Sequence, residues 1–317
     1  MTTLIGTVTR PAVGTRARTR SLRKTGLALG GIGVGIAALS LLASISAGAL
    51  ASGEATADQV AASAILAFGL ATAGFATVKI GIGVILVGIV RRLWVRVEAV
   101  KTALPELIHE RSPGEDHLGD YESPFGPATA TRDIPGPLPI HRMAQLLWAP
   151  MLAMGGMLVA IGLLVDLIAA SNTGAAGVAS SEFAWAQGLM FLGETSLLAG
   201  ISFLLGTILA SIRAGGGEVQ RSLGLTVKTL RMPSIAKAFV ALMVAGIMVG
   251  IVQFIGYVVA ASSATTADTA AAFAWLGPLR EFGLGLLLAG IVLALATIAK
   301  VLGFQFSRIT QIITSGR

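Results

Sequence analysis

The sequence predicts an all-α integral membrane protein in which six transmembrane helices form three parallel tandem hairpins with both termini in the cytoplasm. Composition, six long apolar stretches and the placement of charge support this prediction. Of the 317 residues, 54% are hydrophobic and only 12% are charged, whereas soluble domains carry about 25% charged residues. A lipid bilayer is therefore the expected surrounding of most of the chain.

Six apolar stretches have the length that a membrane requires. A helix needs about 20 apolar residues to cross about 30 Å of hydrocarbon. Several stretches exceed that length, which predicts tilted or protruding helices. The predicted spans are residues 25–51, 60–91, 143–170, 182–213, 234–262 and 271–303.

The connections between the spans alternate in charge, and this alternation predicts the topology. The links near 52–59, 171–181 and 263–270 contain no Lys or Arg, whereas the other links and both tails are basic. Basic loops of membrane proteins stay on the cytoplasmic side. Both termini are therefore predicted to be cytoplasmic, in a plasma or inner membrane.

The four tryptophans predict the same span boundaries, because Trp side chains favour the membrane interface. Trp94 and Trp148 lie at predicted inner boundaries, and Trp185 and Trp275 lie at the outer starts of the fourth and sixth spans.

Five segments follow from these spans. They are a basic cytoplasmic tail (1–24), a hairpin with an amphipathic extension (25–101), a Pro-rich cytoplasmic loop (102–142), a second hairpin with a linker (143–233), and a third hairpin with an amphipathic C-terminus (234–317). A cleaved signal peptide is disfavoured, because the first apolar stretch far exceeds the core of about 7–15 residues that such peptides have. The Arg-rich tail also permits an organellar transit peptide, although no clear amphipathic helix is present there.

Apolar residues continue at helical spacing beyond the second and sixth spans. Such extensions can lie in the membrane interface, pack on a partner, or cover the protein's own bundle. The residues are Leu93, Trp94, Val97, Val100 and Leu104 after the second span, and Leu302, Phe306, Ile309 and Ile313 after the sixth.

The hairpins also resemble one another in sequence. The residues around Trp185 match those around Trp275 at an offset of 90, and Gly74 and its neighbours match those around Gly193 at an offset of 119. Because each hairpin begins and ends on the same side, the repeats are predicted to be parallel and related by an axis along the membrane normal. A shared bias toward Ala, Gly and Leu is the alternative explanation.

Ionisable side chains inside the spans are the most unusual chemistry of the chain. A charge at the bilayer centre costs about 2.5–3.5 kcal/mol, so each is expected to face protein or water and to have a partner. Lys79, Glu194, Arg280 and Glu281 form a candidate polar network, in which Lys79 pairs with Glu194, and Arg280 with Glu281 or Glu194. Asp166 lies near the outer end of its span and is expected to reach water.

The candidate network has three possible roles. It can set the register of the helices, line a path for an ion, proton or small polar solute, or contact charges of another subunit. Gln187, Gln253 and Tyr257 are the other notable polar residues of the spans, and Pro278 is a possible break in the sixth helix.

No motif for catalysis, a cofactor or a metal was found. The absence of cysteine excludes disulfides and thiolate metal ligands from this chain. All three histidines lie in or beside the Pro-rich loop, where His109, Glu110, Asp116 and His117 have no metal-site spacing and are interpreted as a solvated polar cluster. The net charge is +7, and the basic residues that produce it flank the apolar stretches. This placement indicates membrane topology rather than nucleic-acid binding.

Glycine pairs at GxxxG spacing allow close helix contact, within the bundle or between subunits. They are Gly26 with Gly30, Gly31 with Gly35, and Gly246 with Gly250, in a chain of 40 glycines.

The sequence therefore predicts a non-catalytic integral membrane subunit of a larger membrane protein assembly, with a structural or accessory role and other membrane subunits as partners. The alternative is a small-solute or ion transporter or channel whose intramembrane charges line the path. A membrane enzyme is the least favoured class.

Overall fold

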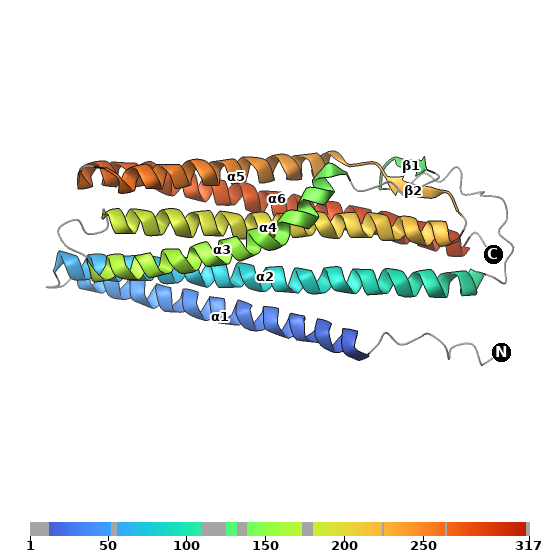
Figure 1. Cartoon of the computed structure of the whole chain (residues 1–317), viewed down its shortest axis with the longest axis horizontal. Helices are drawn as coiled ribbons and strands as arrows, with labels where there is room; N and C mark the ends of the chain where they lie inside the picture. Colours follow the sequence, from blue (N-terminus) through green and yellow to red (C-terminus); the bar gives the residue numbers. More distant parts are fainter. Residues whose placement is uncertain are drawn as a thin grey trace.

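The structure, a computed structural model, describes residues 13–51, 56–108, 125–131, 138–172, 180–223, 225–263 and 265–314. In these ranges six long helices run side by side in an elongated bundle (Figure 1), and two short strands pair near one end. The elements are α1 (Val13–Ala51), α2 (Ala57–Ile108), β1 (Ala128–Thr131), α3 (Pro139–Ser171), α4 (Ser181–Ser222), β2 (Val227–Leu230), α5 (Ser234–Ala261) and α6 (Thr266–Thr314).

The six described helices are each long and apolar enough to cross a membrane. Every predicted span overlaps one of them, so the predicted number and positions of the spans are confirmed for the described part of the chain. The chain is a multi-pass membrane protein whose surrounding is a lipid bilayer.

Helix α4 forms the core of the bundle. In the most apolar stretch of α4, 89% of the residues are buried inside the bundle, against 11–33% in the corresponding stretches of the other five helices. It packs against α2, α3, α5 and α6, whereas α1 packs mainly against α2 at the edge of the bundle. The bundle is therefore arranged around one central helix, which its sequence did not indicate.

Glycines meet where α1 packs on α2, α3 on α4 and α5 on α6. A Cβ atom on the first glycine of each pair would lie 2.6, 2.7 and 3.3 Å, respectively, from the carbonyl oxygen of the second, which is closer than ordinary van der Waals contact. Small residues allow this approach between membrane helices. The pairs are Gly33 of α1 with Gly74 of α2, Gly155 of α3 with Gly193 of α4, and Gly246 of α5 with Gly283 of α6.

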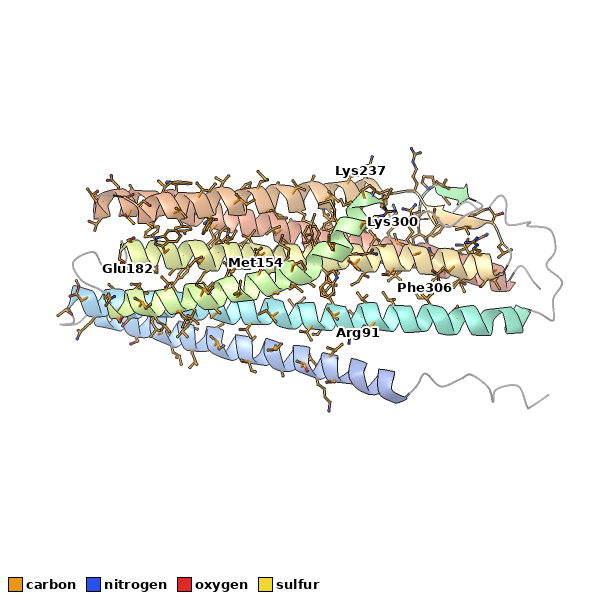
Figure 2. All side chains as sticks on the ribbon, viewed as in Figure 1. Arg91, Met154, Glu182, Lys237, Lys300 and Phe306 are labelled. Atoms are coloured by element: carbon orange, nitrogen blue, oxygen red, sulfur yellow. The ribbon has the colours of Figure 1, made fainter. Side chains whose placement is uncertain are left out.

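Charge separates along the bundle. Helices α2, α4 and α6 each carry an acidic residue in the first turn, where it interacts favourably with the helix dipole. Figure 2 shows one of these, Glu182, at one end of the bundle, and Arg91, Lys237 and Lys300 together at a level well along it. We call these the acidic end and the basic level.

Beyond the basic level, α2, α4 and α6 continue together with strands β1 and β2, and we call this part the stalk (Figure 1). Its centre is the buried side chain of Gln220. The Gln220 amide donates to the Lys228 carbonyl (3.0 Å) and accepts from the Lys228 N–H (2.9 Å) and the Arg308 Nε–H (3.3 Å). One side chain therefore joins α4, β2 and α6.

The C-terminal extension of α6 is helical, and its residues differ in burial. Phe306 is 65% exposed, whereas Phe304, Arg308 and Ile312 are buried. The stalk contains a polar centre at Gln220, so the buried face of α6 is selected by the Arg308 hydrogen bond as well as by apolar contact.

Residues 102–142 are not wholly an irregular loop. Helix α2 extends to Ile108, β1 pairs antiparallel with β2, and α3 begins at Pro139. The partner strand lies in the linker after α4, about 100 residues away, so local sequence gave no sign of this pairing. The small sheet of two four-residue strands is an addition to a predominantly helical fold. The cluster from His109 to His117 lies outside the described residues.

Two prolines lie inside helices. Pro278 does not end α6, which runs continuously through it, so the possible break at this proline is not present. Pro150 lies within α3, whose first turns cross the bundle at an angle in Figure 1. An internal proline removes one helical hydrogen bond and commonly bends the helix.

Candidate functional site

Three intramembrane charges from three helices meet inside the bundle. Glu194 of α4 places its Oε1 2.7 Å from Lys79 Nζ of α2 and its Oε2 2.8 Å from Arg280 Nη2 of α6. The Glu194 side chain is only 2% exposed. We call these residues the charge triad, in which a single carboxylate holds two cations.

The depth of the triad follows from its position on α4. Glu194 lies nine residues after Trp185 and 19 before Arg213. At 1.5 Å per residue these separations are about 13 Å and about 28 Å. With a hydrocarbon core of about 30 Å between interfaces, the triad lies within the apolar layer and nearer to the acidic end.

The second cation of the triad has further partners. Arg280 Nη2 is 3.3 Å from Thr72 Oγ1, and the guanidinium carbon lies 4.7 Å from the ring centre of Phe68 and 5.8 Å from that of Phe191. A desolvated cation–π contact is worth about 2 kcal/mol. The triad has two cations and one carboxylate, so one positive charge is not neutralised by Glu194. The aromatic rings stabilise Arg280 through these cation–π contacts.

Aromatic rings pack on the acidic side of the triad. Phe183 contacts Phe68 at 6.3 Å and Phe273 at 5.8 Å, both edge to face, and Tyr257 lies 5.7 Å from Phe273. These rings come from α2, α4, α5 and α6. Such a cluster limits water access, which strengthens the ion pairs of the triad.

The fourth residue of the predicted network does not join the others. Glu281 is exposed, and among the described residues it forms no ion pair. Neighbouring residues on a helix point in different directions, so Arg280 faces the core while Glu281 faces outward. The sequence left Glu281 and Glu194 as possible partners of Arg280, and in the structure Arg280 pairs with Glu194.

Asp166 is fully buried, which contradicts the expectation that it reaches water. Its carboxylate lies against Gly69 of α2, and neither oxygen has a hydrogen-bond partner among the described residues. The reason is that α3 packs on both α2 and α4. The position of Asp166 near the end of its predicted span gave no indication that it contacts α2.

Uncharged polar groups lie near the triad, and some of their atoms lack a partner in the described part of the chain. They include Gln187 Nε2 and Thr195 Oγ1 on α4 and Gln253 Oε1 on α5. Gln253 is nevertheless held in place, because its Nε2 donates to the Leu276 carbonyl of α6 at 2.8 Å. Buried glutamines inside predicted spans were the only sequence signal for this region.

The triad joins helices rather than presenting a free reactive group, because both carboxylate oxygens of Glu194 are engaged by cations. Among the described residues no group of three or more His, Cys, Asp or Glu could hold a metal ion. The chain matches no protein-family model, no curated protein and no solved structure.

Proposed function

We propose that the chain is a non-catalytic integral membrane subunit of a larger membrane protein assembly, with a structural role. The observation that carries this proposal is the free face of α1. Gly26 and Gly33 face α2, but a Cβ atom on Gly30, Gly31 or Gly35 would meet nothing within 4 Å. The Gly31–Gly35 pair thus points away from the described bundle.

Large apolar side chains accompany this glycine face. On α1 they are between 56% and 63% exposed, and they include Leu27, Ile32, Leu39 and Leu42. A helix held by one neighbour, with a GxxxG face directed outward, allows a helix of another subunit to approach closely. The subunit proposal assigns this face to a transmembrane helix of a different membrane protein.

The proposal includes the topology of three tandem hairpins, with the basic level and both termini on the cytoplasmic side of a plasma or inner membrane. The recurring glycine contact supports a true triplication. Gly74, Gly193 and Gly283 hold corresponding places in α2, α4 and α6, and they are separated by the sequence offsets of 119 and 90 residues. The basic residues at one level support the orientation.

Native mass measurement after gentle purification tests the subunit proposal. The wild-type chain is expected to carry a different membrane protein at fixed stoichiometry. The double variant Gly31→Leu/Gly35→Leu is expected to lose most of that partner, because the added side chains prevent close helix approach. Gly285→Leu on α6, where a Cβ atom also meets nothing within 4 Å, is the matched control and should keep it.

Two results would contradict the subunit proposal. One is a wild-type chain that is only a monomer or homo-oligomer in several mild detergents. The other is equal partner retention by the α1 double variant and the wild type.

A transporter or channel for a small polar solute is the second candidate, and the unpartnered polar atoms near the triad favour it. Buried polar atoms normally have hydrogen-bond partners, so Gln187, Thr195 and Gln253 can contact a solute. Their helices, α4 and α5, pack against each other.

A liposome flux assay checks this second candidate. The wild type should conduct a small ion or solute, and Gln187→Leu/Gln253→Leu should lose most of the flux while Gln145→Leu, at an exposed position of α3, retains it. No flux above empty liposomes for a panel of small inorganic ions and polar solutes would reject the candidate.

A further inference from the structure

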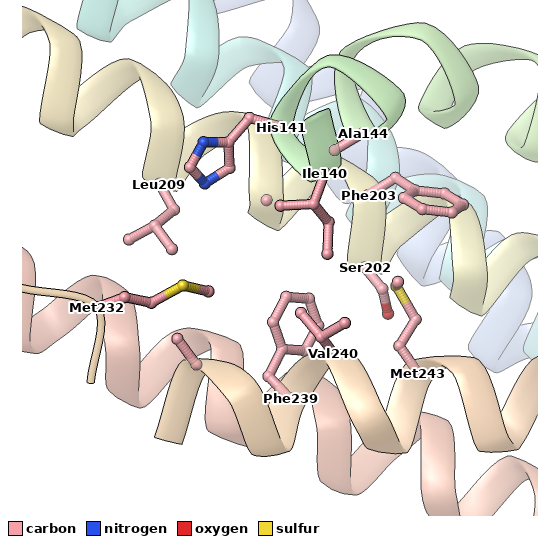
Figure 3. A pocket seen from close by; sticks show the side chains of 12 residues that line it. Ile140, His141, Ala144, Ser202, Phe203, Leu209, Met232, Phe239, Val240 and Met243 are labelled. Carbon is pink, nitrogen blue, oxygen red and sulfur yellow. The ribbon is translucent and has the colours of Figure 1, made fainter. Parts of the chain in front are cut away.

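A groove lies near the basic level between the first turns of α3, the middle of α4 and the start of α5 (Figure 3). Ile140 of α3 faces Phe239 and Val240 of α5 across it. It is a shallow surface groove, and its lining is apolar apart from His141 and Ser202. The groove exists because α3 crosses the bundle there instead of packing along α5.

A second recess continues the groove toward the stalk. It shares His141, Leu209, Met232 and Ala236 with the first. Its lining adds a cation, Arg213. The combined groove is therefore apolar on the membrane side and basic on the stalk side.

Arg213 is available to a ligand. Its Nε has no hydrogen-bond partner among the described residues, and neither recess is lined by an acidic side chain. Three exposed basic residues, Arg142, Arg231 and Lys237, each follow or precede a lining residue in sequence. Arg213 is the only described Lys or Arg that lines either recess, and the three exposed basic residues add positive charge to the same region of the chain.

The depth of Arg213 matches the headgroup layer. It lies 28 residues after Trp185 on the continuous helix α4, which is about 42 Å of helix. Membrane thickness with headgroups is about 40–45 Å. Since Trp185 lies at the acidic end, Arg213 is at the opposite headgroup level.

The first turns of α3, which contribute to the groove, also carry exposed apolar side chains. Met143 and Leu146 of α3 are exposed large apolar side chains on the first turns of that helix. A basic pocket between transmembrane helices at one membrane face is a known arrangement for anionic lipid headgroups. Charge at one end and apolar lining at the other match a molecule with a phosphate and a hydrocarbon chain.

We propose that this groove binds one anionic phospholipid, with its phosphate beside Arg213 and His141 and one acyl chain along Phe203, Phe239 and Met243. The lipid fills the space left between α3 and α5. It thereby joins the crossing segment of α3 to the third hairpin.

Native mass spectrometry of the delipidated full chain tests the proposal, with phosphatidylglycerol and phosphatidylcholine of identical acyl chains as probes. One phosphatidylglycerol should bind at least about tenfold more tightly than phosphatidylcholine, a ratio equivalent to about 1.4 kcal/mol. Arg213→Gln should remove most of this preference. Lys24→Gln, which removes an exposed charge from α1, should leave it unchanged.

Val240→Trp provides an independent test, because it fills the apolar half of the groove and should abolish binding of both lipids. Inorganic phosphate should not compete, since the acyl chain contributes to binding. Equal binding of the two lipids by the wild type would overturn the proposal, even if the variants fail to fold. Equal losses in Arg213→Gln and Lys24→Gln would also overturn it, because they indicate unspecific charge attraction.

Discussion

Glu194→Gln is expected to destabilise the bundle by about 3–5 kcal/mol, the cost of breaking a buried ion pair by removing one partner. The substitution leaves Lys79 and Arg280 in an apolar layer without a counterion, and both now contact the Glu194 carboxylate within 2.8 Å. Because these ion pairs add to the packing of α2 and α6 on the central helix α4, the loss affects three helices at once.

Thermal unfolding in detergent and the amount of chain in the membrane measure this effect. Glu281→Gln is the matched control, since it removes an exposed carboxylate one residue from Arg280 and should change little. The triple variant Lys79→Met/Glu194→Leu/Arg280→Met should recover much of the lost stability, because hydrophobic residues can replace a buried charge cluster. If Glu194→Gln behaves like Glu281→Gln, the triad does not hold the helices together.

Gly193→Leu is expected to separate α3 from α4 and to cost about 3 kcal/mol or more, which is the upper range for overpacked positions. A Cβ atom at Gly193 would lie 2.7 Å from the Val159 side chain and 2.8 Å from the Gly155 carbonyl. A backbone carbonyl in a helix cannot rotate away, so the two helices must move apart.

The melting temperature in detergent checks this prediction, together with size-exclusion behaviour. Gly285→Leu, on an open face of α6, has the same change in side-chain volume and should melt close to the wild type. Gly74→Leu should be as harmful as Gly193→Leu, because its Cβ atom would lie 2.8 Å from the α1 backbone at Ala37 and at Gly33. A Gly193→Leu protein as stable as Gly285→Leu would show that the helices are not in close contact there.

The sequence predicted the spans well because the hydrophobicity of a segment is a local property. Helix length and apolar content decide whether a segment can cross a bilayer, and each of the six stretches meets that requirement independently of the others. The weakly predictable parts were the connections. Strand β1 is stabilised by pairing with β2, and neither four-residue strand has a strong signal by itself.

The charge triad was only partly predictable. Similar depth along the spans favoured a contact between Lys79 and Glu194, because helices that cross the same membrane place equal depths at one level. Depth could not decide between Glu194 and Glu281 as the partner of Arg280. That choice depends on which side of α6 faces α4, and hence on the rotation of a packed helix.

By itself, the sequence determined that this chain has six membrane-spanning helices and that its charges separate toward their ends. Only the tertiary structure decided that α4 is central, that Asp166 is buried, and that α1 keeps a free glycine face. The physical reason is that lipid tails are as apolar as a protein interior. An apolar side chain therefore satisfies either surrounding equally, and helix packing alone decides which of the two it meets.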